Sequence, residues 1–451
     1  MPAMTNPSLQ RKIGPATATF IVVANMVGAG IFITSGILAA RLPGPGWILA
    51  CWLLGGLIAL SGALSYAELA TRMPEIGGEY VYLKKLYHPV LGFLTGWTSF
   101  VVGFTVPIAA SALAFSEYVS GALAGTGGPS PAASAFSKKA LALAVIALFT
   151  LIHYGGVRLG SRVQNVLTSL KILIIAGLAA AGFLAVRSPV PALSFPSAGT
   201  GTLLGFGTAM MMVMFAYSGW NASTYIAGEM RNPRRNLPLS LIAGTLIVTA
   251  LYLAVNVFIF RSLPYAEAGG VIPIVAQASV RTFGPWMGKA LGLLVGFCLL
   301  SSLSAYIILC PRVYYSMAKD GLFFSFARRI HPRFGVPGWS ILCQGFFASV
   351  MVLVGSFEQL LIYMGFALNI FPWLAVLGVF LERRRNGGNA AAGAFKTWGY
   401  PATPLFYLVA SLGLMAVNYV NRPLESTAAV VTVLAGIPVF VLWLGRKRGR
   451  E

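Results

Sequence analysis

The sequence predicts an all-α polytopic membrane protein with twelve membrane-spanning helices. Of its 451 residues, 57% are hydrophobic and only 10% are charged, whereas soluble domains carry about 25% charged residues. Apolar stretches of about 18 residues or more, long enough to cross a bilayer as helices, recur along the whole chain. Two of these stretches are interrupted near their middle by small residues, at 28–30 and at 216–219.

The apolar stretches define the expected elements. The first follows Arg11 and Lys12 but is longer than the apolar region of a signal peptide, so it is expected to remain as a span. Residues 122–138 and 383–399 are expected to be loops, and residues 1–451 are expected to form a single transmembrane domain. The expected spans are 15–40, 45–70, 90–121, 139–155, 163–187, 202–230, 237–262, 285–317, 338–355, 358–381, 402–420 and 426–445.

The basic residues favour one orientation of these spans. Of the 32 Lys and Arg residues, 23 lie in segments on the side of the N-terminus, 8 lie on the other side, and Lys171 lies within a span. Because positively charged loops stay in the cytoplasm, both termini are expected there. The same distribution accounts for the net charge of +21 without a nucleic acid partner.

The two interruptions form the candidate site. A helix that breaks at membrane depth exposes backbone groups that hydrocarbon cannot satisfy, so they must face protein, a cavity or a ligand. Two breaks about 190 residues apart predict a transporter built from two repeats. Close helix packing is an alternative explanation for Gly28-Ala29-Gly30. Packing alone, however, does not predict a second interruption at the matching place in the other half of the chain.

A broken helix offers both kinds of polar backbone group. The half-helix after the break presents N–H groups and the positive end of its dipole, which hold a carboxylate. The half-helix before the break ends in free carbonyl groups, which accept from an ammonium. An α-amino acid carries both charges, so the breaks predict recognition of its zwitterion.

The chain also resembles a known family. Gly28-Ala29-Gly30-Ile31-Phe32, the stretch 68–82, the segment 215–221 and the segment 232–238 look like motifs of the amino acid–polyamine–organocation superfamily, in the same order. The L-type amino acid transporter branch is the most similar, and the likeness covers about residues 13–385.

The resemblance implies a particular fold. It implies five plus five helices in two inverted repeats, here residues 13–187 and 202–385, with the first and sixth helices discontinuous. It also implies two additional C-terminal helices, here within residues 400–446, although this part of the chain matches only in being hydrophobic.

The resemblance also implies substrate contacts. The backbone of Ala29 and Gly30 would bind the carboxylate, carbonyl groups near Met26, Phe215 and Ser218 would bind the amine, and the Phe215 ring would close over the site. Ala29 departs from the family, which often has Ser or Thr there, so a side-chain contact is not expected. For Asn369, a pocket-lining role and an interhelical hydrogen bond are both open. The expected substrate-binding residues are Met26, Val27, Gly28, Ala29, Gly30, Ile31, Phe215, Ala216, Ser218, Gly219 and Asn369.

Lys171 is the one basic residue within an expected span. A charge at this depth usually faces the bundle interior with a partner. Its ammonium is expected to take the place of the sodium ion of related sodium-coupled carriers, bridging the first break and Ser301, Ser302 and Ser304. Members of the resembled family carry a similar Lys and need no sodium. There are two alternatives for Lys171. Its side chain could extend to the membrane surface, or it could take part in proton coupling.

The other ionisable residues favour a neutral substrate. Relatives that carry cationic amino acids have a Glu after Gly-Trp in span three, where this chain has Val102, and Glu117 is expected at the membrane interface. His88, His153 and His331 are also expected at the interface. They have no metal-ligand spacing with one another or with Cys, so no metal site is predicted, and no cofactor is expected. The four cysteines all lie in apolar segments, so no disulfide framework is implied.

Charged residues near the cytoplasmic ends of the spans are candidates for the ion pairs of an inner gate. A solvated helix end is the alternative explanation. The candidates are Glu229, Arg234, Arg235, Arg312 and Asp320.

The sequence therefore favours a sodium-independent secondary transporter of neutral L-amino acids that works by alternating access. Obligate exchange or facilitated flux is the first choice of mechanism, and proton symport is the second. A polyamine carrier would need acidic residues around the site, an enzyme would need an acid, His or Cys constellation at depth, and a channel would need repeated polar rings. The expected spans contain none of these.

The partner and membrane also follow from sequence features. Animal members of the resembled family pair with a single-span glycoprotein through a Cys between spans three and four. Residues 122–138 contain no Cys, so no such partner is expected. The chain is expected to be a monomer. The short loops and the charge bias favour a cytoplasmic membrane.

Overall fold

The computed structural model describes residues 9, 11–123, 131–186, 195, 200–271, 274–354, 357–385, 393–421 and 423–448. Within these ranges all regular elements are helices, and an isolated β-bridge joins Ile13 and Met230. The helices are α1 (Pro15–Met26), α2 (Gly30–Ala39), α3 (Pro45–Arg72), α4 (Glu79–Leu86), α5 (Pro89–Thr98), the π-helix η1 (Ser99–Gly103), α6 (Thr105–Leu123), α7 (Pro131–Tyr154), α8 (Val157–Ala185), α9 (Thr200–Tyr217), the 3₁₀-helix η2 (Ala222–Glu229), α10 (Pro233–Ser262), α11 (Tyr265–Ala268), α12 (Ile274–Phe283), α13 (Trp286–Lys319), the 3₁₀-helix η3 (Ser325–Arg328), α14 (Gly338–Val354), α15 (Phe357–Arg385), α16 (Ala402–Asn421), α17 (Pro423–Leu434) and α18 (Gly436–Arg448).

Eight helical segments in the described residues are long and apolar enough to cross a membrane. Two shorter apolar segments, Gly338–Val354 and Ser426–Leu442, accompany them. The predicted all-helical class is therefore confirmed for the described chain. The eight segments are Pro15–Ala39, Pro45–Arg72, Pro89–Ser120, Phe136–Tyr154, Val157–Ala185, Pro233–Ser262, Trp286–Lys319 and Ala402–Asn421.

Two predicted loops are shorter than expected. α7 begins at Pro131, so residues 131–138 are helical, and residues 124–130 lie outside the described residues. A proline suits the first helical position because its ring presets φ and its missing N–H is not needed there. α15 likewise continues to Arg385, residues 393–399 are not helical, and the intervening residues lie outside the description.

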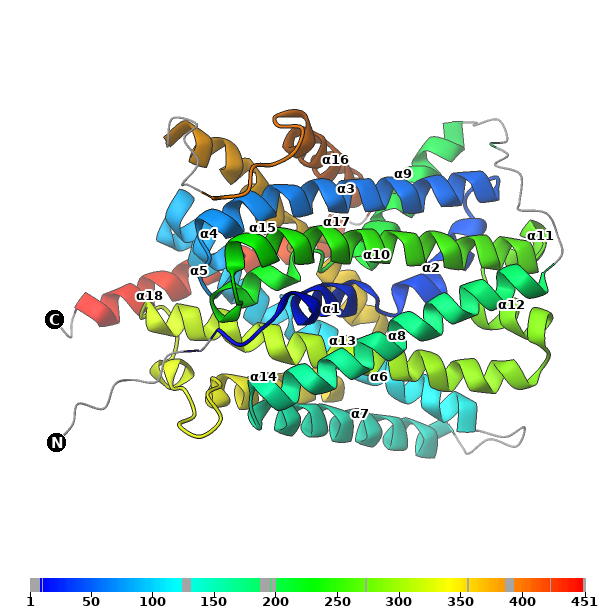
Figure 1. The fold of residues 1–451 in the computed structure, drawn as a ribbon, viewed down its shortest axis with the longest axis horizontal. Helices are drawn as coiled ribbons and strands as arrows, with labels where there is room; N and C mark the ends of the chain where they lie inside the picture. Colours follow the sequence, from blue (N-terminus) through cyan, green and yellow to red (C-terminus); the bar gives the residue numbers. More distant parts are fainter. Residues whose placement is uncertain are drawn as a thin grey trace.

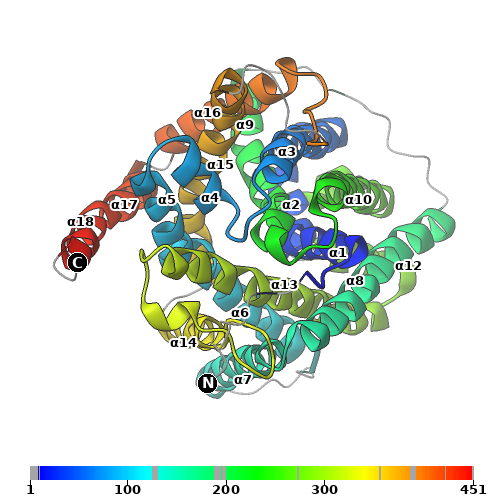
Figure 2. The ribbon, with the colours of Figure 1, turned by 60° about the vertical axis from the view of Figure 1, so that its left-hand side comes forward.

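The helices form one bundle, and the last turn of α18 lies at one end of it, which we call the terminal end (Figure 1). α4 and the start of α5 lie there, whereas the end of α2, α11 and α12 lie at the opposite end, which we call the far end. α1 lies inside the bundle against α10, α13 and α8, and α2 packs against α9 and α12. α7, α8 and α12 lie at the periphery (Figure 2).

Candidate functional site

A cavity of about 740 Å³ lies inside the bundle and is lined by both helix breaks. Arg41 and Asn421, toward the far end, and Glu79, toward the terminal end, also line it. A cavity of this size can hold a small organic molecule. The lining residues that come from the two breaks are Met26, Gly28, Ala29, Gly30, Phe215, Ala216, Ser218 and Gly219.

The first break leaves a helix N-terminus facing the cavity. α1 ends where Val27 leaves helical geometry, with φ −79° and ψ 87°, and α2 begins at Gly30. Within the described ranges, the N–H groups of Ala29 and Gly30 donate to no acceptor. A Cβ placed on Gly28 would meet nothing within 4 Å. The start of α2 therefore presents free donors and the positive end of its dipole to open space, which suits a carboxylate.

The second break packs directly against the first. Gly219 separates α9 from η2 with φ +95°, a conformation that favours glycine. A Cβ on Gly219 would lie 2.8 Å from the Cβ of Asn25, and a Cβ on Gly30 would lie 2.9 Å from the Cβ of Ala216. The two glycines therefore let the backbones of the two breaks touch and share one cavity.

The three carbonyl groups expected to bind an amine differ in availability. The Met26 oxygen accepts from the Gly28 N–H at 3.0 Å and from the Tyr252 hydroxyl at 2.7 Å. The Phe215 oxygen accepts from the N–H of Ser218 at 3.0 Å and from its hydroxyl at 2.7 Å. No described residue donates to the Ser218 oxygen. Since a carbonyl has two lone pairs, the Ser218 oxygen has the most capacity left for a ligand.

Tyr252 on α10 joins the two breaks, and the sequence did not single it out. Its hydroxyl lies 2.7 Å from the Met26 oxygen and 2.9 Å from the Ala216 oxygen, so both carbonyl groups share its one proton. The residue is fully buried, and its ring packs against Trp52 and Tyr217. Tyr252 therefore holds the broken ends of α1 and α9 at a fixed separation.

Two of the expected binding residues do not line the cavity with their side chains. Val27 is 1% exposed and Ile31 is fully buried, and both belong to the hydrophobic core. Asn369 and Phe215 do line the cavity and are partly exposed. At the first break, Gly28, Ala29 and Gly30 therefore line the cavity, whereas Val27 and Ile31 pack into the core.

Lys171 on α8 binds the first break. Its Nζ donates to the Val27 oxygen at 2.7 Å and to the Ser302 hydroxyl at 2.9 Å, and it lies 3.4 Å from the Ala24 oxygen. The Ser302 hydroxyl in turn donates to the Val27 oxygen at 2.8 Å. Lys171 is fully buried, so its ammonium and Ser302 tie the end of α1 to α8 and α13.

The other two serines of the predicted cluster have different partners. Ser301 lies 3.0 Å from the Thr168 hydroxyl, and Ser304 lies 2.9 Å from Nε2 of His153. His153, next to the end of α7, is only 3% exposed and is therefore packed inside the protein. Successive helix residues point about 100° apart, so only Ser302 faces Lys171.

Glu79 is a buried carboxylate on the cavity wall, which corrects the inference that no buried acid faces the site. It begins α4, outside the candidate spans, and is 4% exposed. The Tyr66 hydroxyl donates to its Oε1 at 2.8 Å, and the Asn221 amide donates to the same oxygen. Burial raises the pKa of Glu79 to about 7, although hydrogen bonds from Tyr66, Asn221 and Tyr225 lower it.

We expect Glu79 to make stability depend on pH. The folded protein holds the Glu79 proton more tightly than the unfolded chain, so this residue stabilises the fold at low pH and loses that contribution as pH rises through about 7. The loss between about pH 5 and about pH 8 is at most about 3 kcal/mol. Thermal unfolding of wild type and Glu79→Gln across this range measures it. A pH profile that is equally steep in both proteins would contradict the assignment.

Two ion pairs lie near the terminal end of the bundle. Glu229 at the end of η2 pairs with Arg312 on α13 at 2.7 Å, with side chains 0% and 4% exposed. Asp320 pairs with Lys84 on α4 at 2.5 Å. The buried Glu229–Arg312 pair is not a solvated helix end, whereas Arg234 and Arg235 are exposed.

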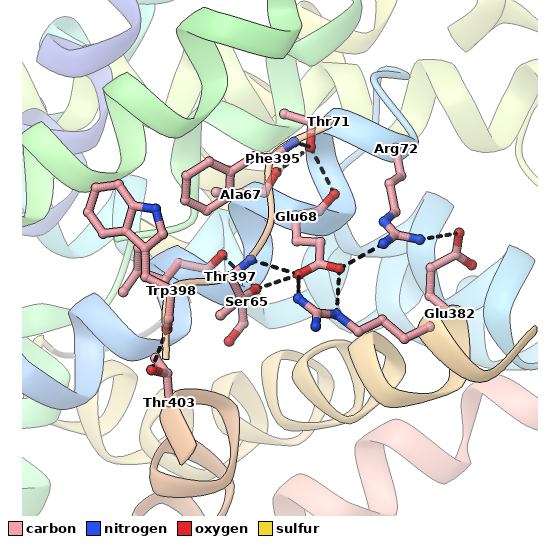
Figure 3. Close-up of polar contacts among 12 residues, drawn as sticks. Ser65, Ala67, Glu68, Thr71, Arg72, Glu382, Phe395, Thr397, Trp398 and Thr403 are labelled. Carbon is pink, nitrogen blue, oxygen red and sulfur yellow. Dashed lines mark hydrogen bonds and ion pairs between the residues drawn. The ribbon is translucent and has the colours of Figure 1, made fainter. Parts of the chain in front are cut away.

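Glu68 anchors a second cluster at the terminal end (Figure 3). Its carboxylate accepts from Arg383 of α15 at 2.8 and 2.7 Å and from Arg72 at 2.9 Å. It also accepts from the Thr397 N–H at 2.8 Å and from the Thr397 hydroxyl at 2.7 Å. One buried carboxylate therefore fastens the end of α15 and the segment before α16 to α3.

The described residues give no sign of a metal centre. They contain no group of three His, Cys, Asp or Glu side chains that could hold a metal ion. Cys51, Cys298, Cys310 and Cys343 are free thiols.

Comparison with known proteins identifies the family. Residues 13–443 match the model of the amino acid permease family. The chain is 27% identical over 446 residues to the serine/threonine exchanger SteT of Bacillus subtilis (strain 168), covering 96% of each protein. It is 31% identical over 459 residues to the human b(0,+)-type amino acid transporter 1, covering 98% of this chain and 90% of the relative. It is 26% identical over 459 residues to the mouse Asc-type amino acid transporter 1, covering 96% and 81%.

These relatives are transporters and not enzymes, and the resemblance inferred from the sequence motifs is confirmed. The apolar helices agree with a multi-pass membrane protein. The chain therefore belongs to the amino acid permease family.

Proposed function

We propose that this chain exchanges neutral L-amino acids across the cell membrane by alternating access and without sodium. The pair of helix breaks at one cavity carries the proposal, because α2 presents free N–H groups and the second break presents a free carbonyl in the described structure. An α-amino acid carries a carboxylate and an ammonium on one carbon and matches both. The serine/threonine exchanger among the relatives supports exchange as the mode.

The substrate is held at its shared end by the backbone. Its carboxylate accepts from the N–H groups of Ala29 and Gly30, and its ammonium donates to the Ser218 carbonyl, with the Met26 and Phe215 carbonyls as neighbours. The side chain extends toward Asn369, and the Phe215 ring closes over the cavity. Glu79 does not call for a cationic substrate, because Tyr66 and Asn221 already donate to its carboxylate.

Lys171 stands in for a coupling ion. Its ammonium already donates to the Val27 carbonyl and to Ser302. A sodium ion at this place would need the same oxygens, so the lysine makes sodium unnecessary. A fixed cation of this kind favours obligate exchange.

The fold proposed for this cycle has twelve spans, with α1–α2 as the first and α9–η2 as the sixth, in inverted repeats 13–187 and 202–385. Two further helices follow within 400–446. Both termini lie in the cytoplasm, so the far end faces outward. The cavity reaches Arg41 and Asn421 there, while ion pairs lie near the terminal end, which supports an outward-open state. We propose a monomer without a covalent partner.

Counterflow in proteoliposomes tests the function. Uptake of radiolabelled L-amino acids is measured with and without unlabelled amino acid inside, with sodium or a substitute, and at matched or stepped pH. Exchange predicts uptake that requires internal amino acid and is unaffected by sodium. Uptake into empty vesicles driven by an inward proton gradient would instead support proton symport. The buried Glu79 carboxylate is the observation that favours this second candidate.

A further inference from the structure

A second hollow, separate from the central cavity, lies on α8 near the terminal end. It has a volume of about 380 Å³. Its wall combines the first turns of α8 with Lys12, which lies in the segment before α1. We call it the α8 hollow, and it is lined by Lys12, Val157, Arg158, Ser161, Arg162, Asn165 and Val166.

Three cations converge on the α8 hollow without a carboxylate partner. Among the ion pairs of the described residues, none includes Lys12, Arg158 or Arg162. Arg158 and Arg162 are one helical turn apart and therefore lie on the same face. Guanidinium groups bind phosphate oxygens in a forked geometry, and the N-terminus of α8 adds a favourable dipole. The hollow is therefore suited to a phosphate group.

Asn165 gives the hollow a further polar group. Its Nδ2 donates to the Thr17 hydroxyl of α1 at 3.0 Å, and its buried Oδ1 has no donor among the described residues. A buried acceptor without a donor is costly. A ligand that carries a hydroxyl or ammonium beside its phosphate would satisfy it, together with the Ser161 hydroxyl.

An exposed apolar stripe continues from the hollow along α8. Val166, Leu170 and Leu173 are 56%, 42% and 67% exposed, and they follow Arg162 at spacings of three and four residues. α8 lies at the periphery of the bundle, so this face meets lipid (Figure 2). The cations at the helix end and the stripe beyond them match the headgroup and the acyl chains of a phospholipid.

We propose that the α8 hollow binds the headgroup of an anionic phospholipid, with its phosphate on Arg158, Arg162 and Lys12 and its acyl chains along Val166, Leu170 and Leu173. A free phosphate ion shares the headgroup chemistry but would make no use of the stripe. This inference concerns a face of the molecule away from the transport cavity and does not depend on which amino acid is carried.

Lipid binding to the purified full chain tests the proposal. Native mass spectrometry is used to compare phosphatidylglycerol with phosphatidylcholine, and thermal unfolding is measured with each lipid and with inorganic phosphate. The Arg158→Gln/Arg162→Gln variant is expected to bind phosphatidylglycerol about tenfold more weakly or worse. The matched control is Arg328→Gln/Arg329→Gln, which removes the same charge from exposed residues that line neither cavity. It should weaken binding clearly less than the α8 variant does, because it removes only general attraction to anionic lipid.

Each alternative has its own outcome. Equal loss in the two variants would show only general attraction of basic residues to an anionic surface and would overturn the site. Equal stabilisation by inorganic phosphate and phosphatidylglycerol would overturn the lipid as ligand. Because these measurements need no transport, their failure is distinguishable from failure of the proposed exchange function.

Discussion

Lys171→Ala is expected to reduce amino acid exchange by at least about tenfold, because one hydrogen bond from a charged group is worth about 1.5–3 kcal/mol and about 1.4 kcal/mol is a factor of ten in rate. The ammonium holds the Val27 carbonyl and Ser302, so its removal releases the end of α1 from α8 and α13. The N–H groups of Ala29 and Gly30 would then lose their fixed position in the cavity. Initial rates of counterflow in proteoliposomes measure the effect.

Two neighbouring serines provide the matched control for this prediction. Ser302→Ala removes a contact with both Lys171 and Val27 and should slow exchange. Ser301→Ala removes contacts with Thr168 and Gln164, away from the break, and should leave the rate within about twofold of wild type. Exchange that survives in Lys171→Ala, or strong stimulation of the wild type by sodium, would contradict the proposed role of Lys171.

The helix breaks could be located from sequence because their signal is local. Small residues in the middle of an apolar stretch mark the place where a helix cannot continue without help, and Gly219 with φ +95° shows the backbone reason. Lys171 was also identifiable, since a charge in an apolar stretch must find a partner. Its contact with Val27 agrees with the predicted bridge to the first break.

Other parts of the site depend on tertiary packing and could not be predicted. Tyr252 is one aromatic residue among many on apolar helices, and its contacts with Met26 and Ala216 arise only when α10 packs against both breaks. Glu79 lies in a polar connecting segment, so its sequence context indicates a solvated residue. The fold buries it because α4 turns back against α3 and the second break, where Tyr66 and Asn221 reach its carboxylate.

The predicted serine cluster shows the limit of spacing arguments. Ser301, Ser302 and Ser304 are adjacent in sequence, but on a helix they point to different neighbours. Ser302 meets Lys171, Ser301 meets Thr168, and Ser304 meets His153. The loop predicted at 122–138 shows a limit of composition arguments. Residues 131–138 read as a loop by composition, but Pro131 starts a helix there.

Glu229→Gln is expected to lower the free energy of unfolding by about 3–5 kcal/mol, because it leaves the Arg312 guanidinium buried without its counter-ion. Both side chains are almost fully buried, and the pair joins η2 to α13 through contacts at 2.7 and 3.2 Å. Arg312 would keep its hydrogen bond to the Ile308 oxygen and one to the glutamine carbonyl oxygen, but neither balances its charge. Thermal unfolding in detergent measures the loss.

The exposed pair Lys85–Glu75 and a double variant separate burial from charge. Glu75→Gln removes an equivalent ion pair whose side chains are 41% and 53% exposed, and it should change stability by less than about 1 kcal/mol. Glu229→Gln/Arg312→Met removes both buried charges and should be more stable than Glu229→Gln alone. Equal losses from the single and double variants would mean that the lost hydrogen bonds between η2 and α13, and not the unpaired charge, cause the effect. If the pair is also part of the inner gate, Glu229→Asp should keep the charge and yet slow exchange, since a shorter side chain must pull η2 toward α13 to restore the contact.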